Sequence, residues 1–211
     1  MVTGFRRQGP SAGTRLGCPS ITGLCRHTPS AIWVTRSRLA KRAKRARGVV
    51  ASLGGANGQV KCEGLNAKIL KTAANVAKAE GSELHVVHAV SPHGGKGLNG
   101  QQLERDPAEY LRELRGEIQE ACNAMLGDIG LSLTEDRVHL ASGCPAAVIP
   151  EVVKEQGLDL IVMGTRARDG ISGLLVGNTA EKVMTRVDCG VMVVKRDDFA
   201  SLVAREEGMY L

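Results

Sequence analysis

Residues 158–178 read LDLIVMGTRARDGISGLLVGN, and this stretch decides the fold. It begins with an apolar run that has the length and β-branched content of a buried strand, and Gly164 ends that run. A polar loop follows, and Gly177-Asn178 opens a helical pattern. This order of strand, glycine-bearing loop and helix N-terminus suits anion binding, because backbone N–H groups and the helix dipole face the space beyond the strand. The spacing matches neither a Walker A loop nor GxGxxG.

Strands and helices alternate along the rest of the chain. A capped helix is expected from Asp106 and another after Pro145; the remaining strands and helices are expected at residues 48–53 (strand), 65–80 (helix), 84–90 and 137–141 (strands), 179–187 (helix) and 190–194 (strand). Such alternation predicts an α/β fold with a doubly wound parallel sheet and helices on both faces. Ligands of such folds bind beyond the carboxyl ends of the strands, at the point where the strand order reverses.

The glycine spacing of the deciding stretch resembles the nucleotide loop of the universal stress protein family. That loop reads Gly, two residues, Gly, nine residues, Gly, and then Ser, Thr or Asn. Gly164, Gly177 and Asn178 match its first, third and last positions, and Ala167 stands at the second glycine. The resemblance covers residues 47–196 and is closest to the second domain of tandem, E-type members. It implies a five-stranded, Rossmann-like sheet of order 3-2-1-4-5.

The resemblance also implies a ligand, ATP with Mg²⁺. Adenine would lie near the first strand, Val86 and Met163, and the phosphates would lie on backbone N–H groups of the glycine loop. The implied nucleotide-binding residues are Val86, Met163, Gly164, Thr165, Ala167, Gly177, Asn178 and Thr179. Members of the family commonly pair through the fifth strand, which implies a homodimer through Val191 to Val194.

Two departures from the family pattern leave the function open. Ala167 replaces a glycine, and Gly54 stands where the family usually has an Asp that contacts the adenine and ribose. The main hypothesis is a stress-response module that binds ATP. The alternative is a module of the same fold that dimerises, binds a protein partner or holds another small ligand. A third hypothesis is slow ATP hydrolysis with Asp169 as the only acid in the loop, and no catalytic residue is predicted.

The charge of the chain is concentrated at its N-terminal end. Residues 1–47 contain eleven Arg and Lys and no acid, which leaves 28 − 11 = 17 basic against 22 acidic residues in the remainder. We therefore expect a basic, disordered tail over residues 1–46, the domain over 47–196 and a C-terminal tail over 197–211. The basic run 36–47 could bind nucleic acid or an anionic membrane, act in a transit peptide, or belong to sequence that replaced a first domain.

The remaining signals favour a cytoplasmic protein without a metal site. The six cysteines form no C-x-x-C pair, and no apolar run approaches the roughly 20 residues that span a bilayer. His85 and His88 are three apart on a strand, so they are expected to point to opposite faces and not to share a metal ion.

Overall fold

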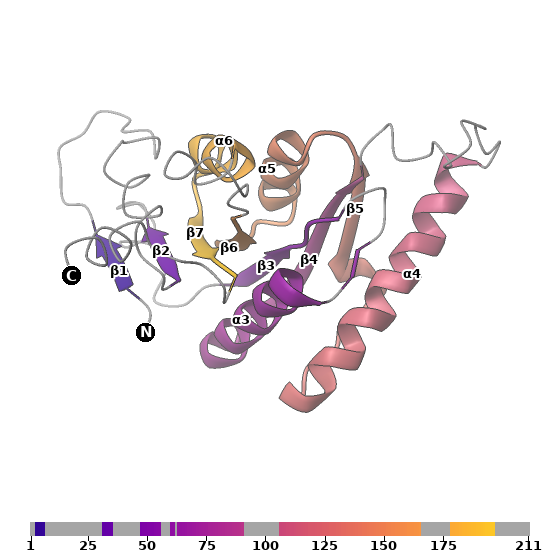
Figure 1. Cartoon of the computed structure of the whole chain (residues 1–211), viewed down its shortest axis with the longest axis horizontal. Coiled ribbons are helices and arrows are strands. Elements are labelled where there is room, and N and C mark those ends of the chain that lie inside the picture. Colours follow the sequence, from indigo (N-terminus) through magenta and orange to yellow (C-terminus); the bar gives the residue numbers. More distant parts are fainter. Residues whose placement is uncertain are drawn as a thin grey trace, which may run out of the picture.

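The computed structural model describes residues 3–6, 31–35, 47–55, 60–61, 63–90, 106–165 and 178–196. They form one seven-stranded sheet of order β1-β2-β7-β6-β3-β4-β5 with helices on either side (Figure 1). The elements are β1 (Thr3–Arg6), β2 (Ile32–Thr35), β3 (Gly48–Ser52), α3 (Gly64–Glu80), β4 (Glu83–Val90), α4 (Pro107–Leu126), β5 (Val138–Ser142), α5 (Pro145–Glu155), β6 (Leu160–Gly164), α6 (Asn178–Arg186) and β7 (Gly190–Val194). Two short 3₁₀ helices, Gly127–Ile129 and Glu135–Arg137, lie between α4 and β5.

The five strands from β3 onward confirm the predicted fold. Neighbouring strands among them are parallel, and their order β5-β4-β3-β6-β7 is the expected 3-2-1-4-5. β3 lies at the centre and pairs with both β4 and β6. The chain first builds the sheet on the β4 side of β3 and then returns to add β6 on its other side. The strand order therefore reverses between β3 and β6, which is where this fold class places its ligands.

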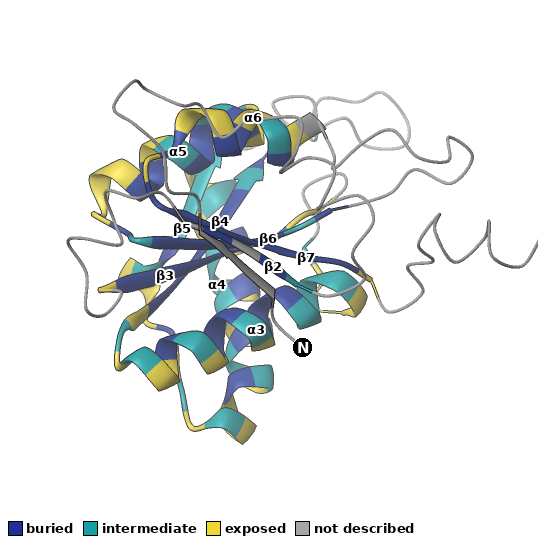
Figure 2. Ribbon diagram, turned by 90° about the vertical axis from the view of Figure 1, so that its left-hand side faces the viewer, coloured by how far each residue is buried: buried dark blue, intermediate teal, exposed yellow. Residues whose placement is uncertain are grey.

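Two apolar clusters lie on the two faces of the sheet (Figure 2). α3 and α4 cover one face with side chains such as Leu70 and Ile118, and α5 and α6 cover the other with side chains such as Ile149 and Val183. The core is aliphatic, as the composition requires. No helix in the described part of the chain combines the length and apolar character that a bilayer crossing needs.

Local signals in the sequence account for the helix ends. The Asp106 carboxylate caps α4 by accepting a hydrogen bond from the Ala108 backbone N–H at 3.0 Å, and Pro107 occupies the first turn. α3 ends at Gly81, whose φ of 64° is the left-handed conformation that glycine adopts without strain.

The structure differs from the prediction at the N-terminal end of the chain. Residues 3–6 and 32–35, which were expected to be disordered, form two additional strands of the sheet. β2 pairs antiparallel with β7, and β1 pairs parallel with β2. Ile32 and Val34 are buried in the same cluster as Val191 and Val193, so apolar burial holds β2 in place. The basic run 36–46 and the tail 197–211 lie outside the described residues.

This arrangement occupies the edge at which a homodimer through Val191 to Val194 was predicted, and that homodimer stays a prediction. Such a dimer requires a free edge on β7. In the structure that edge is hydrogen-bonded to β2, with Ile32 opposite Val193, Trp33 opposite Met192 and Val34 opposite Val191. A second copy cannot pair with β7 while β2 is in place.

Candidate functional site at the carboxyl ends of β3 and β6

The candidate site lies where β3 and β6 end side by side. Ser52 is opposite Met163 in the parallel ladder, so the two strands end at the same level. Beyond them the chain leaves through Gly54 on one side and through Thr165 on the other. The fold therefore brings two residues to the same edge of the sheet, as the sequence predicted. They are Gly54, which stands where the family usually has an Asp, and Gly164, where the glycine loop begins.

Gly164 has a packing role that does not depend on any ligand. A Cβ atom at this position would lie 2.6 Å from Cδ2 of Leu65 and 2.9 Å from Cδ1 of Ile69, both in the first turns of α3. Such distances are below van der Waals contact, so a larger residue at this position would require the Leu65 and Ile69 side chains to shift. The close approach places the beginning of α3 beside the candidate site.

Asn66, which the sequence analysis did not single out, fixes the backbone at Gly54. Its Oδ1 accepts a hydrogen bond from the Gly54 N–H at 3.0 Å, and its Nδ2 donates to the Gly54 carbonyl at 2.6 Å. The same Nδ2 donates to the Lys61 carbonyl at 2.9 Å. Asn66 thus ties the residues that precede α3 to the first turn of that helix. The pattern of an Asn in a first helical turn was visible in the sequence, but its partners were not.

His88 supports the end of β3 from the neighbouring strand. Its Nδ1 lies 3.1 Å from the Leu53 carbonyl, so Nδ1 carries the proton and donates. Burial lowers the pKa of His88, which keeps the ring neutral. Its buried Nε2 has no hydrogen-bond partner among the described residues. His85 instead contacts His139, with Nδ1 and Nε2 3.0 Å apart, which confirms that the two β4 histidines point to opposite faces.

The structure separates the two side chains that were expected near adenine. Val86 is buried in the cluster under α3 and α4, whereas Met163 is buried in the cluster under α5 and α6. They lie on opposite faces of the sheet, so one adenine ring can pack on only one of these side chains.

The remaining predicted residues belong to the glycine loop and the start of α6. The backbone N–H of Thr165 donates to the Val194 carbonyl at 3.0 Å, so it is not available to a phosphate. Thr179 is exposed in the first turn of α6, and Asn178 begins that helix, although its side chain is outside the described set. Ala167, Asp169 and Gly177 also lie outside the described residues.

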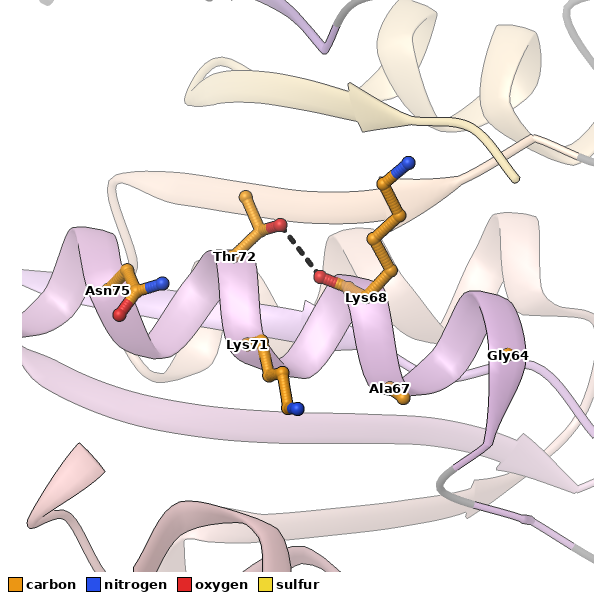
Figure 3. Close-up of a pocket in the computed structure, with 6 residues that line it drawn as sticks. All are labelled: Gly64, Ala67, Lys68, Lys71, Thr72 and Asn75. Carbon is orange, nitrogen blue, oxygen red and sulfur yellow. Dashed lines mark hydrogen bonds between the residues drawn. The ribbon is translucent and has the colours of Figure 1, made fainter. Parts of the chain in front are cut away.

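A separate hollow runs along the outer side of α3 (Figure 3). It is lined by Gly64, Ala67, Lys68, Lys71, Thr72 and Asn75, none of which was predicted to bind nucleotide. The side chains of Lys68 and Lys71 point to different sides of the helix, so they do not converge on one anion. Among the described residues, no group of three or more His, Cys, Asp or Glu side chains could hold a metal ion.

The strand order, with its switch point between β3 and β6, defines a doubly wound α/β domain. Domains of this class bind ligands beyond the carboxyl ends of the strands at that point. The family model named "Universal stress protein family" matches residues 64–195. The chain belongs to the universal stress protein family.

Individual relatives agree with this assignment. Universal stress protein E of Escherichia coli K12 is 27% identical over 190 residues, which are 90% of this chain and 58% of that protein. The crystal structure of PA1789 from Pseudomonas aeruginosa PAO1 superimposes with a TM-score of 0.65 at 23% identity, over 99% of this chain and 66% of that one. A universal stress protein crystallised in complex with cAMP superimposes with a TM-score of 0.50 at 19% identity, over 73% of this chain and all of that one. This chain therefore spans only part of the longer relatives.

The comparisons also correct the predicted extent of the resemblance. The match to the Escherichia coli protein covers 90% of this chain, which leaves about a tenth of it, roughly 211 − 190 = 21 residues, outside the match. Even if all of these lay at the N-terminal end, residues 22–46 would be part of the match. The N-terminal region thus has a counterpart in a relative, whereas the sequence analysis placed the start of the similarity at residue 47.

Proposed function

We propose that this protein is a stress-response module that binds an adenine nucleotide, ATP with Mg²⁺, at the carboxyl ends of β3 and β6. The main observation in support is the position of Gly164. It ends β6 at the switch point, beside the end of β3 and in close contact with the first turns of α3. The sequence after Gly164 then provides the glycine loop, which leads directly into the N-terminus of α6. A solved member of the family holds cAMP, an adenine nucleotide, which supports this ligand class.

The phosphates are assigned to the glycine loop and to the start of α6. Backbone N–H groups at a helix N-terminus have no intrahelical partner and attract anions. Hydrogen bonds to charged groups contribute roughly 1.5–3 kcal/mol each, so three or four of them suffice for micromolar binding, which requires about −8 kcal/mol. The Thr165 N–H is already hydrogen-bonded to the Val194 carbonyl. The phosphates therefore depend on the backbone N–H groups of the other predicted residues: Gly164, Ala167, Gly177, Asn178 and Thr179.

The adenine and ribose are assigned to the side of the crevice formed by β3 and β4. Of the two predicted side chains, Val86 lies on the face covered by α3, the helix that also contacts Gly164 and Gly54. Met163 contributes through its backbone, because its side chain lies on the other face. Gly54 offers no carboxylate to the ribose, so this part of the site binds less tightly than the family pattern implies.

A second candidate is a module of the same fold that holds another small ligand or a protein partner. The observation that favours it is the loss of polar groups at the crevice. Gly54 lacks a side chain, and the N–H of Thr165 is used within the sheet. A site with fewer free backbone donors and no carboxylate at position 54 binds a nucleotide less tightly.

Calorimetric titration of the full chain with ATP, ADP and AMP in the presence of Mg²⁺ tests the proposal. Saturable binding that weakens as phosphates are removed supports a phosphate cradle. A titration with GTP provides the control for the base. The absence of heat at millimolar concentrations of all four nucleotides would contradict nucleotide binding and favour the second candidate.

A further inference from the structure

His88 is a buried polar side chain in an apolar part of the sheet. It is 3% exposed and alternates along β4 with Val86 and Val90, so it lies on their face of the sheet, in the cluster under α3 and α4. Its partner on β5 is Leu140, which packs against the same cluster. Buried polar atoms are normally hydrogen-bonded, so each ring nitrogen of His88 calls for a partner.

One ring nitrogen of His88 fixes the end of β3. Leu53 follows the last residue of that strand, and its backbone N–H donates to the Val87 carbonyl at 3.0 Å, which continues the ladder by one residue. The Leu53 carbonyl lies 3.1 Å from Nδ1 of His88 and accepts its proton. His88 therefore sets the position from which the chain enters Gly54 at the candidate site.

The other ring nitrogen of His88 is an acceptor. Because the proton of the neutral ring is on Nδ1, Nε2 presents a lone pair. Nε2 is buried and has no hydrogen-bond partner among the described residues. Only an N–H or O–H group can satisfy it, and a phosphate or carboxylate oxygen cannot. This atom is therefore suited to a part of the ligand other than the phosphates.

We infer that Nε2 of His88 accepts a hydrogen bond from the ligand in this crevice, and that with a nucleotide the donor is the 6-amino group of adenine. This inference rests on the proposed function. Val86, to which the base is assigned, lies on the same face two residues before His88, and Leu53 leads from His88 to the crevice. A flat base that packs on the apolar side chains of this face can present its polar edge to Nε2.

The chemistry of the two purine bases makes His88 a specificity-determining residue. Adenine has an N–H donor at position 6, whereas guanine has an oxygen acceptor there. An oxygen would face the lone pair of Nε2 and leave both atoms unpaired. Unpaired buried groups are costly, because little water is present to replace the lost hydrogen bond. The crevice should therefore favour bases with an amino group at position 6.

Titration calorimetry of the full chain with ATP and with purine riboside 5′-triphosphate, each with Mg²⁺, tests this inference. The analogue has hydrogen in place of the 6-amino group, so it lacks the one donor without adding an acceptor. Removing the partner of a buried acceptor should weaken binding roughly 5- to 30-fold. The comparison measures the donor alone, because the sugar, the phosphates and the metal ion are unchanged.

Two variants of His88 separate the roles of its two nitrogens. In His88→Asn the amide can reach the position of Nδ1 and donate to the Leu53 carbonyl, but nothing replaces Nε2. In His88→Gln the longer side chain brings its carbonyl oxygen to the position of Nε2. We expect His88→Asn to bind ATP and the analogue with affinities within about twofold of each other, and His88→Gln to keep a several-fold preference for ATP. A purely structural role predicts the opposite order, since Asn keeps the bond to Leu53.

Nitrogen NMR of the unchanged chain gives a second readout that does not depend on how the variants fold. The resonance of an unprotonated ring nitrogen shifts when it accepts a hydrogen bond. With isotope-labelled histidine, the Nε2 resonance of His88 should move on saturation with ATP and stay in place on saturation with the analogue.

The outcomes separate this inference from the proposed function. If the unchanged chain binds ATP but binds the analogue equally well, the inference is overturned and nucleotide binding stands. The same conclusion follows if His88→Asn keeps the full preference for ATP, or if the Nε2 resonance does not move with ATP bound. If the unchanged chain does not bind ATP, the proposed function fails and this inference fails with it.

Discussion

The side chain of Asn66, in the first turn of α3, is hydrogen-bonded to both backbone polar groups of Gly54. Its Oδ1 lies 3.0 Å from the Gly54 nitrogen, and its Nδ2 lies 2.6 Å from the Gly54 carbonyl oxygen. Gly54 follows the end of β3, so this contact sets where the chain leaves the sheet at the switch point. The helix that carries Asn66 also packs Leu65 and Ile69 against Gly164 at the end of β6. One helix therefore fixes both sides of the candidate nucleotide crevice.

Replacing Asn66 should weaken this corner of the domain. Asn66→Ala removes three hydrogen bonds, each worth about 0.5–1.5 kcal/mol, and we expect a loss of roughly 1–3 kcal/mol in the free energy of unfolding. Urea denaturation measures this loss. Asn66→Asp is the control, since its carboxylate can still accept from the Gly54 N–H but donates nothing, so its loss should be intermediate. Equal free energies of unfolding for the unchanged chain and both variants would show that the Asn66 hydrogen bonds do not contribute to stability.

Gly164→Ala should be destabilising because the added methyl group meets α3. The Cβ would lie closer than 3 Å to Leu65 and Ile69, and overpacking of this kind costs typically about 1–3 kcal/mol. Thermal and urea unfolding should show the loss. The double variant Gly164→Ala with Leu65→Ala provides the control, because a smaller side chain at 65 makes room. The steric account predicts a combined loss below the sum of the single losses, and simple additivity would contradict it.

Gly54→Asp should increase the affinity for ATP. A Cβ at this position has only Asn66 Oδ1 within 4 Å, at 3.9 Å, so the side chain fits without displacing the backbone. A carboxylate that accepts from a ribose hydroxyl contributes about 1.5–3 kcal/mol, which is roughly 10- to 100-fold in Kd by titration calorimetry. The control is Gly116→Asp in α4, which adds the same charge where no heavy atom lies within 4 Å of its Cβ. An equal effect of both variants would indicate a general charge effect.

Combining Gly54→Asp with Ala167→Gly should increase the affinity further. The matching family position is glycine, and alanine is strained there by about 1–2 kcal/mol if the backbone is left-handed. If the double variant bound ATP no better than the unchanged chain, the idea that these two positions weaken the site would fail.

Stability should fall as the pH is lowered below about 6.5, because of the histidine pair on β4 and β5. Burial, together with the charges of His85 and Arg115, lowers the pKa of His139 to about 4, and burial lowers the pKa of His85. Glu83 and Asp136 oppose these shifts, and Arg137 adds to the lowering at His85. The unfolded chain therefore takes up protons first, so the stability present above pH 6.5 is lost between 6.5 and about 4.

His139→Gln measures the contribution of this pair. Each histidine accounts for a slope of at most about 1.4 kcal/mol per pH unit in that range. Urea unfolding at pH 7.5, 6 and 5 should show a smaller loss for the variant than for the unchanged chain. The His85 Nδ1–His139 Nε2 contact at 3.0 Å needs one neutral ring, which adds to the effect. Parallel pH profiles of the two proteins would contradict this assignment.

The sequence predicted the α/β sheet well because its signals are local. The buried runs at β3 and β6, the cap at Asp106 and the stop at Gly81 each lie within a few residues of the element they define. Alternation along the chain then limits the topology to few choices. The start of the glycine loop at Gly164 was predicted for the same reason, since its spacing is read along one segment.

The features that the sequence analysis missed depend on contacts between distant residues. β2 is a short strand in a basic, glycine-containing region, and its burial requires β7, which lies far from it in the sequence. The alternation in Ile32–Thr35 was the available signal. Two further features depend on strand register and helix position, which periodicity alone does not set. They are the hydrogen bonds between Asn66 and Gly54, and the placement of Val86 and Met163 on opposite faces of the sheet.

Hydrogen exchange of the full chain, with and without saturating ATP and Mg²⁺, tests the central claim that the nucleotide occupies this crevice. We predict slower exchange in peptides that contain residues 53–55 and the first turn of α6 from residue 178, with no change along α4. The Gly164→Ala variant, compared under the same conditions, should lose this protection. Protection confined to other segments, or none under conditions in which calorimetry shows binding, would contradict the account.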